Sequence, residues 1–246
     1  MGQILAVTSG KGGTGKTTIS AAVASCLAAE GKRVLCIDAD IGLRNLDISL
    51  GMADLATISF TDVISGRYEL QDATANEEIA GLFLLTAPII ERAETISPDA
   101  FGKLLDQVRE AFDYCVIDSP AGLGQGFQLA VRDADRVLVV TGADPASMRD
   151  AAGTADHLTQ LGKQDVRLIV NRITPRLFRM MHLTVDDVMD EVGLPLLGIV
   201  PEDPNVMLAA VRNTPLILYT DQGAAIAAVH IARRIDGQKA KLMKIR

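Results

Sequence analysis

The stretch TSGKGGTGKTT, residues 8–18, joins a short apolar run to an alanine-rich segment with helical spacing. It fits the pattern G-x-x-x-x-G-K-[ST] and lies between an expected strand and an expected helix, as this phosphate-binding pattern requires. The glycines let backbone N–H groups turn inward around phosphate oxygens, and the helix that begins here adds the positive end of its dipole. We therefore expect ATP or ADP to be bound by Gly10, Lys11, Gly12, Gly13, Thr14, Gly15, Lys16, Thr17 and Thr18.

The loop contains two lysines, although a phosphate-binding loop needs only the second. Lys16 is expected to bridge the β- and γ-phosphates during catalysis, and the hydroxyl of Thr17 to hold Mg²⁺. Lys11 has two interpretations. It is either a solvated surface lysine or a catalytic lysine that reaches the nucleotide of a second subunit.

Carboxylates follow two other apolar runs of the chain. Asp38 and Asp40 come at the end of the second run, and Asp118 ends a later one. In open α/β sheets ligands bind beyond the carboxyl ends of the strands, so these side chains should lie beside the phosphate loop. A carboxylate at this edge, Asp38 or Asp40, can orient an attacking water and help hold Mg²⁺, and Asp118 is expected to contact Mg²⁺. For each aspartate alone, a helix cap or a turn residue remains an alternative.

Apolar, β-branched runs alternate with segments of helical spacing, and the runs are continuous, as in strands covered on both faces. This order predicts an α/β fold with a doubly wound, mostly parallel sheet and helices on both faces. The expected strands are Gln3–Thr8, Arg33–Ile37, Leu82–Thr86, Tyr114–Asp118, Arg136–Thr141, Arg167–Asn171 and Leu197–Val200. The expected helices are Lys16–Glu30, Ala100–Phe112, Ser147–Leu161, Thr184–Val192 and Gln222–Ile235. No linker or repeat interrupts them, so residues 1–237 are expected to form one ATPase domain.

Charge and cysteine usage bound the function further. The 246 residues include 24 Lys+Arg against 31 Asp+Glu, a net charge of −7, so the chain has no overall attraction to nucleic acid or anionic lipid. Cys26, Cys36 and Cys115 form no CxxC pair and no metal-binding spacing, which favours buried free thiols in a reducing cytoplasm. No apolar stretch reaches the roughly 18 residues of a membrane-spanning helix, and no signal peptide is expected.

The segment KGGTGKTT resembles the deviant Walker A motif of the MinD/ParA family of ATPases. Other motifs resemble the septum site-determining branch of that family, with similar spacing from residue 2 to about residue 235: DADIGLRNLDISLGM, DVISG, DSPAG, SMRDA and GIVPEDPNV. The resemblance implies a homodimer in the ATP state and slow hydrolysis that a partner stimulates. It also implies recruitment of a division inhibitor, and a cytoplasmic protein associated peripherally with the inner face of the cell membrane.

The resemblance also implies roles for single residues. It makes Lys11 the lysine that crosses the dimer interface, Asp40 the residue that positions water, and Asp118 the Walker B carboxylate. Asp38 and Asn45 would lie in or beside the first switch. The adenine contacts would come from Asn171, Arg172, Pro201, Glu202 and Asp203. From the residues alone, an amide at Asn171 can read a base edge, but an Asn at a strand end is also often a cap.

Residues 238–246 form a basic tail on an acidic chain, in which Lys239, Lys241, Lys244 and Arg246 surround Leu242, Met243 and Ile245. Gly237 interrupts the preceding helix, and the tail does not form a clean amphipathic pattern. Each cation near an anionic leaflet contributes about 1 kcal/mol and each buried apolar side chain roughly 1.5–3 kcal/mol. Two tails linked in a dimer would therefore bind much more strongly than one. The segment is a candidate for membrane targeting, and a solvated, disordered tail is the alternative.

The leading hypothesis is an ATPase that dimerises on the membrane and acts as a spatial switch in division-site placement, without binding nucleic acid. A partition ATPase that binds DNA needs a basic surface, yet no basic cluster precedes the tail. A flagellar-placement relative typically carries an N-terminal extension, whereas the first strand here is expected to begin at Gln3. An iron–sulfur carrier needs ligand cysteines after strands or in a CxxC pair, and none is so placed. A non-enzymatic module would lack the lysines and aspartates of the loop and strand ends, which are all present.

Overall fold

The strands form one sheet, and its order confirms the predicted doubly wound class. A computed structural model describes residues 1–41, 44–89 and 93–243. Within them, eight strands lie in the order β3-β4-β2-β5-β1-β6-β7-β8, and only β3 and β4 pair antiparallel. Their bounds are Gln3–Thr8 (β1), Val34–Asp38 (β2), Thr74–Ala75 (β3), Leu82–Leu85 (β4), Tyr114–Asp118 (β5), Arg136–Thr141 (β6), Val166–Ile173 (β7) and Leu196–Pro201 (β8).

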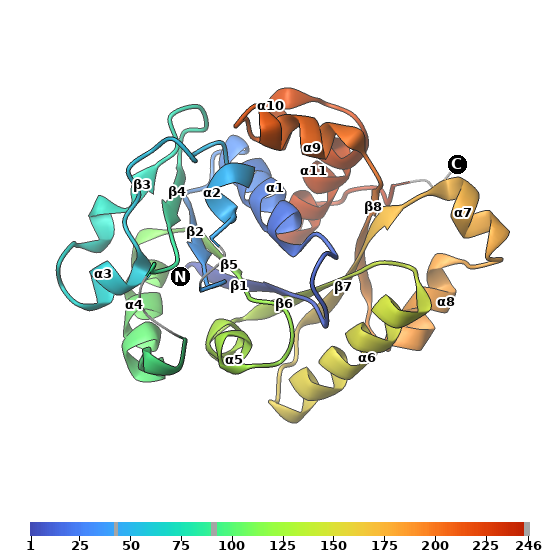
Figure 1. Cartoon of the computed structure of the whole chain (residues 1–246), viewed down its shortest axis with the longest axis horizontal. Coiled ribbons are helices and arrows are strands. Elements are labelled where there is room, and N and C mark those ends of the chain that lie inside the picture. Colours follow the sequence, from blue (N-terminus) through green and yellow to red (C-terminus); the bar gives the residue numbers. More distant parts are fainter. Residues whose placement is uncertain (42–43, 90–92, 244–246) are drawn as a thin grey trace.

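Helices cover both faces of the sheet, with α1 and α9 to α11 on one side and α4 to α6 on the other (Figure 1). The α-helices are Lys16–Ala29 (α1), Leu46–Ser49 (α2), Phe60–Ile64 (α3), Pro98–Ala111 (α4), Gln125–Arg132 (α5), Pro145–Gln160 (α6), Pro175–Met180 (α7), Val185–Val192 (α8), Pro204–Val211 (α9), Leu216–Tyr219 (α10) and Gly223–Ile235 (α11). Short 3₁₀ turns lie at Leu70–Asp72 (η1) and Ala93–Thr95 (η2). No helix in the described ranges has both the length and the apolar character needed to cross a membrane.

Each central strand contributes to two hydrophobic cores. In β1, Ile4 and Ala6 face the core under α4 to α6, whereas Leu5 and Val7 face the core under α1 and α11. All four side chains are fully buried. Because successive residues of a strand point to opposite faces, a strand covered on both sides must be apolar at every position. This explains why the strands were recognisable as unbroken apolar runs.

The seven predicted strands and five predicted helices are confirmed, with ends that differ by at most two residues. The largest shifts are of two residues: α4 and α6 begin earlier than expected, at Pro98 and Pro145, and β7 ends later, at Ile173. Ser97 and Asp144 cap these helices by accepting hydrogen bonds from the amides of Ala100 and Ser147. A cap followed by a proline is a helix-start signal, and it was present in the sequence. The two-residue strand β3 was not predicted.

The strand order brings three loops together. β5 lies between β1 and β2, and the register aligns Asp118 of β5 with both Val7 of β1 and Asp38 of β2. The loops that follow these three strands therefore leave the same edge of the sheet side by side. This is the edge at which ligands bind in doubly wound sheets.

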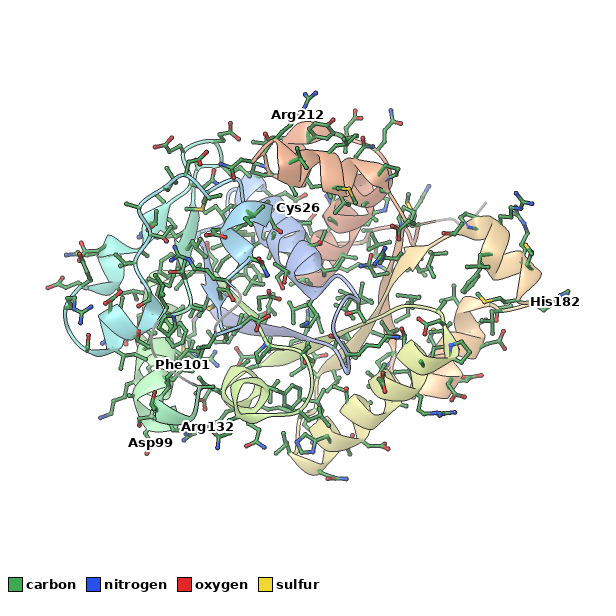
Figure 2. The ribbon with its side chains drawn as sticks, viewed as in Figure 1. Cys26, Asp99, Phe101, Arg132, His182 and Arg212 are labelled. Atoms are coloured by element: carbon green, nitrogen blue, oxygen red, sulfur yellow. The ribbon has the colours of Figure 1, made fainter. Side chains whose placement is uncertain are left out.

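The cysteines are buried and unpaired, as predicted. Cys36 and Cys115 lie within β2 and β5, and Cys26 lies on α1 (Figure 2). Burial raises the pKa of the Cys26 thiol to about 12, so this thiol is not a ready ligand for a metal or cluster. The placement of all three cysteines argues against the iron–sulfur alternative.

The described part of the tail, residues 238–243, folds back onto the domain. Helix α11 ends at Ile235, and Gly237 has the positive φ of 77° that reverses the chain. Arg234 then donates hydrogen bonds to the carbonyl oxygens of Leu197 (2.7 Å) and Ala240 (3.2 Å). The side chain of Met243 packs against both cores. Lys244, Ile245 and Arg246 lie outside the described residues, and the division at residue 237 stays a prediction.

Candidate nucleotide site

The loop between β1 and α1 offers its backbone amides to an anion. Gly13 and Gly15 have φ values of 81° and 91°, which favour glycine, and Gly15 directly precedes α1. No side chain caps the start of α1. In the described part of the chain, the amides of residues 12–15 donate to no protein acceptor. Amides without protein partners at the start of a helix are the donors that anion sites use, so the loop has the donors of a phosphate site.

A network of hydroxyls holds Asp118 under this loop. The hydroxyl of Thr17 donates to Oδ2 of Asp118 (2.6 Å), and the hydroxyl of Ser20 donates to Oδ1 (2.8 Å). Burial raises the pKa of Asp118 to about 7, and Thr17, Ser20 and Lys16 oppose that rise. The arrangement leaves the lone pairs of the Thr17 oxygen free for a metal ion. The sequence analysis missed Ser20, which lies three residues after Thr17 on the same face of α1.

Asp38 and Asp40 have different surroundings. Asp38 is buried, and its carboxylate accepts hydrogen bonds from the amides of Asp40 (2.9 Å) and Leu46 (3.3 Å). Its hydrogen bonds therefore hold the backbone at Asp40 and Leu46, after the end of β2. Asp40 is half-buried and lines the cavity with Lys16. Burial raises the pKa of Asp40, whereas the charge of Lys16 lowers it.

A cavity of about 520 Å³ lies above the loop, which is a size typical of small-ligand sites. It is lined by the predicted residues Gly12, Gly13, Gly15, Lys16, Thr17, Thr18, Asp40, Asn45, Asn171, Arg172, Pro201, Glu202 and Asp203. Ala121, Val206 and Met207 also line it and were not predicted. Gly10, Lys11 and Thr14 are not among the lining residues, and Asp118 lies beneath the cavity floor.

The residues expected around adenine make contacts of their own. Asn171 is buried and donates from Nδ2 to the carbonyl oxygen of Thr14 (2.8 Å). This leaves its Oδ1 and the second hydrogen of Nδ2 able to meet a base. Arg172 forms a two-pronged ion pair with Glu202, at 2.7 and 3.2 Å. Asp203 accepts from the amides of Asn205 and Ala224, both at 2.9 Å, and so joins α9 to α11.

Lys11 points away from the cavity. Its ammonium group lies 3.3 Å from Asp144, the residue that caps α6. The hydroxyl and amide of Ser147, with Lys11, lower the pKa of Asp144 to about 2. Both side chains of the ion pair are well exposed, so the pair contributes little stability and is easily exchanged. The sequence identified Lys11 as unusual but did not predict this partner.

The donor set fits Mg²⁺ held largely by a nucleotide. Thr17 supplies a hydroxyl oxygen, and Asp40 and Asp118 supply carboxylates, all of which suit a hard cation. The described residues contain no group of three or more His, Cys, Asp or Glu able to hold a metal by themselves. Mg²⁺ commonly binds through one or two protein oxygens together with phosphates and water.

Comparisons with known proteins agree with this geometry. Residues 5–216 match the CobQ/CobB/MinD/ParA nucleotide binding domain. The septum site-determining protein MinD of Thermotoga maritima is 37% identical over 97% of this chain and 89% of its own length. The MinC:MinD cell division protein complex of Aquifex aeolicus superposes with a TM-score of 0.91 at 34% identity, covering 98% of both chains.

A nucleotide-bound relative connects the fold to the ligand. The septum site-determining protein MinD of Pyrococcus horikoshii, solved with Mg-ADP, has a TM-score of 0.84 at 28% identity over 96% of each chain. The expectation of a nucleotide and Mg²⁺ is thereby supported independently of the loop geometry. The chain belongs to the MinD/ParA family of nucleotide-binding ATPases, within its septum site-determining MinD branch.

Proposed function

We propose that this chain is an ATPase that uses ATP binding and hydrolysis as a spatial switch in the placement of the bacterial division site. The observation that carries the proposal is the convergence of the phosphate loop, the Thr17–Asp118 pair and Asp40 at one edge of the sheet. The names of the relatives from Thermotoga and Aquifex support the biological role.

The residues divide the chemistry between them. The free amides of residues 12–15 and the ammonium group of Lys16 bind phosphate oxygens and stabilise the charge that develops during transfer. Thr17, Asp40 and Asp118 would hold Mg²⁺, and the bound ion would neutralise further charge on the phosphates. Asp40 holds the attacking water in line with the γ-phosphate. Asn171 meets the edge of adenine through the part of its side-chain amide that Thr14 leaves free, while Pro201 packs beside the base.

The ATP-bound state is a homodimer in which Lys11 leaves Asp144 and contacts the nucleotide of the partner subunit. The exposed ion pair to Asp144 supports this step, because a weak contact is readily replaced by a triphosphate. The dimer recruits a division inhibitor, as the MinC:MinD complex of the Aquifex relative suggests. A separate protein stimulates hydrolysis.

Replacing Lys11 with alanine is expected to leave ATP binding within about threefold of wild type but to abolish the ATP-dependent dimer and most hydrolysis. The reason is that Lys11 lies outside its own nucleotide cavity. Nucleotide titration and light scattering with and without ATP measure the two properties. Lys103→Ala, which removes an exposed lysine from α4, is the matched control and should behave as wild type. A Lys11→Ala protein that dimerises and hydrolyses normally would make Lys11 an ordinary surface lysine.

The C-terminal tail gives the dimer its attachment to anionic membranes and places the protein at the inner face of the cell membrane. Lys239 and Lys241 are exposed and form no ion pair within the described residues. Leu242 is 40% exposed, whereas Met243 is packed against the domain and would have to leave it to enter lipid. Such a tail is weak alone and gains strength when a dimer presents two copies.

Removal of residues 238–246 is expected to abolish ATP-dependent binding to anionic liposomes and to spare hydrolysis in solution, because the nucleotide residues lie elsewhere. Co-sedimentation and phosphate release measure the two effects. Lys103→Ala again serves as the control for loss of a cation outside the tail. Continued sedimentation of the shortened protein with anionic liposomes would exclude the tail as the attachment.

One experiment tests the whole switch. The full chain is sedimented with anionic liposomes in ATP and in ADP, and its retention on double-stranded DNA is measured under the same conditions. The proposal expects liposome binding in ATP alone and no salt-sensitive DNA binding. DNA retention without liposome binding would instead identify a partition ATPase, whose affinity would fall steeply with salt.

A further inference from the structure

The end of β7 has an unusual backbone conformation beside the phosphate loop. Arg172 has a φ of 60°, a left-handed value that is uncommon for a residue other than glycine. Side chains of successive strand residues normally point to opposite sides. Here Asn171 and Arg172 both reach the same loop, which Figure 1 shows between β1 and α1 near β7. The strained residue therefore allows two neighbouring side chains to act on one target.

Both side chains bind carbonyl oxygens of the loop. Asn171 donates to the carbonyl of Thr14 (2.8 Å), and Arg172 donates from Nη1 to the carbonyl of Gly13 (3.2 Å). A Cβ atom on Gly15 would lie 2.3 Å from Nδ2 of Asn171, so the two elements are in direct contact. On the other side of the loop, the hydroxyl of Ser9 donates to the carbonyl of Lys11 (2.7 Å).

These contacts fix the direction of the phosphate-binding amides. In a trans peptide the C=O and the following N–H are coplanar and point in opposite directions. No peptide bond in the described chain is cis. Holding the carbonyls of Gly13 and Thr14 toward the end of β7 therefore turns the amides of Thr14 and Gly15 the other way, and the proposed function places the phosphates on that side.

Glu202 holds Arg172 in place. Its carboxylate accepts hydrogen bonds from both Nε and Nη2 of Arg172. Its backbone amide donates a hydrogen bond to the carbonyl oxygen of Ile173 at 3.0 Å. Glu202 belongs to the loop after β8 that also lines the far side of the nucleotide cavity. One arginine thus joins the loop expected beside the base to the loop expected around the phosphates.

We infer that Arg172 is a positioning residue for the phosphate loop: anchored by Glu202, it holds the Gly13 carbonyl so that the next amide faces the triphosphate. The inference rests on the proposed role of residues 10–18 as the phosphate loop. It differs from the base contact that the family resemblance implies. A residue that contacts the base would affect the affinity only for ligands that contain a base. A residue that positions the phosphate loop affects the affinity for any polyphosphate.

The test compares MgATP with magnesium tripolyphosphate, which has no base, by isothermal titration of the full chain. Arg172→Ala is expected to lose about tenfold in affinity for both ligands, as expected from one charge-assisted hydrogen bond. Arg172→Lys keeps the charge, but a lysine cannot bind the Glu202 carboxylate and the Gly13 carbonyl at the same time. Its affinity for both ligands should therefore stay close to that of Arg172→Ala. Glu202→Gln should weaken both ligands by about threefold.

The control and the contrary results separate this inference from the proposed function. Arg176→Ala removes the same charge from an exposed site on α7 and should change neither affinity. The ion pair between Arg172 and Glu202 is exposed, so the melting temperatures of the Arg172 and Glu202 variants should equal that of the wild type. Two results would contradict the positioning role of Arg172. One is an Arg172→Ala protein with lower affinity for ATP and unchanged affinity for tripolyphosphate, and the other is wild-type affinity in Arg172→Lys. Either result leaves the ATPase switch standing, because wild-type ATP binding tests that separately.

Discussion

Replacing Lys16 with alanine is expected to weaken ATP binding by about 100-fold or more and to abolish the ATP-dependent dimer. Lys16 is only 7% exposed, and its charge lowers the pKa of both Asp40 and Asp118, so it lies among the groups that surround the phosphates. Without it, the negative charge of Asp40 in the cavity and of Asp118 beneath it would no longer be offset by a lysine beside the triphosphate. Nucleotide titration measures the affinity, and light scattering with ATP measures the dimer.

The matched control for this variant is Lys11→Ala, in the same loop. The two substitutions are predicted to have different effects. Loss of Lys16 removes ATP binding, and loss of Lys11 removes only the steps that need a second subunit. A thermal melt checks that the Lys16 variant is folded, since a buried side chain has been removed. A folded Lys16→Ala protein with wild-type affinity and normal dimerisation would contradict the assignment of the loop.

The parts of the site that sequence predicted are those encoded by neighbouring residues. The phosphate loop lies between its strand and its helix, and Asp118 lies at a strand end, so each carries a local pattern. Asp38 also carries that pattern, yet it is buried and binds the amides of Asp40 and Leu46. Asp40, two residues further along the chain, is the one of this pair that lines the cavity. Local pattern therefore located the edge of the site but could not assign a role to each carboxylate.

The parts that sequence could not predict are contacts between distant strands. Asp144 and Arg172 lie more than 130 residues beyond the loop residues that they contact, with separations of 133 for Lys11 and 159 for Gly13. These pairs exist because β6 and β7 follow β1 in the sheet order. No periodicity or spacing encodes that order. The positive φ of Arg172 could not be predicted from its residue type either, because arginine seldom adopts such a value.

Replacing Asp40 with alanine is expected to leave a stable ATP-bound dimer that hydrolyses ATP about 100-fold more slowly or worse. Asp40 lines the nucleotide cavity and is partly exposed, whereas the other two strand-end aspartates, Asp38 and Asp118, are both about 1% exposed. It is therefore the carboxylate best placed to hold a water. Binding should survive because the loop amides, Lys16 and Thr17 remain. Single-turnover phosphate release at saturating ATP measures the chemical step, and light scattering confirms the dimer.

Asp47→Ala is the matched control, because Asp47 lies on the same segment, pairs with Arg44 at 3.5 Å and does not line the cavity. It should turn over ATP at the wild-type rate. Asp40→Asn sharpens the test, since the amide keeps the shape of the side chain but loses the charge that aligns water. It should be as slow as the alanine variant. Wild-type turnover in either Asp40 variant would exclude the water-positioning role. Loss of ATP binding at saturating Mg²⁺ would instead show that Asp40 acts mainly in holding the metal–nucleotide complex.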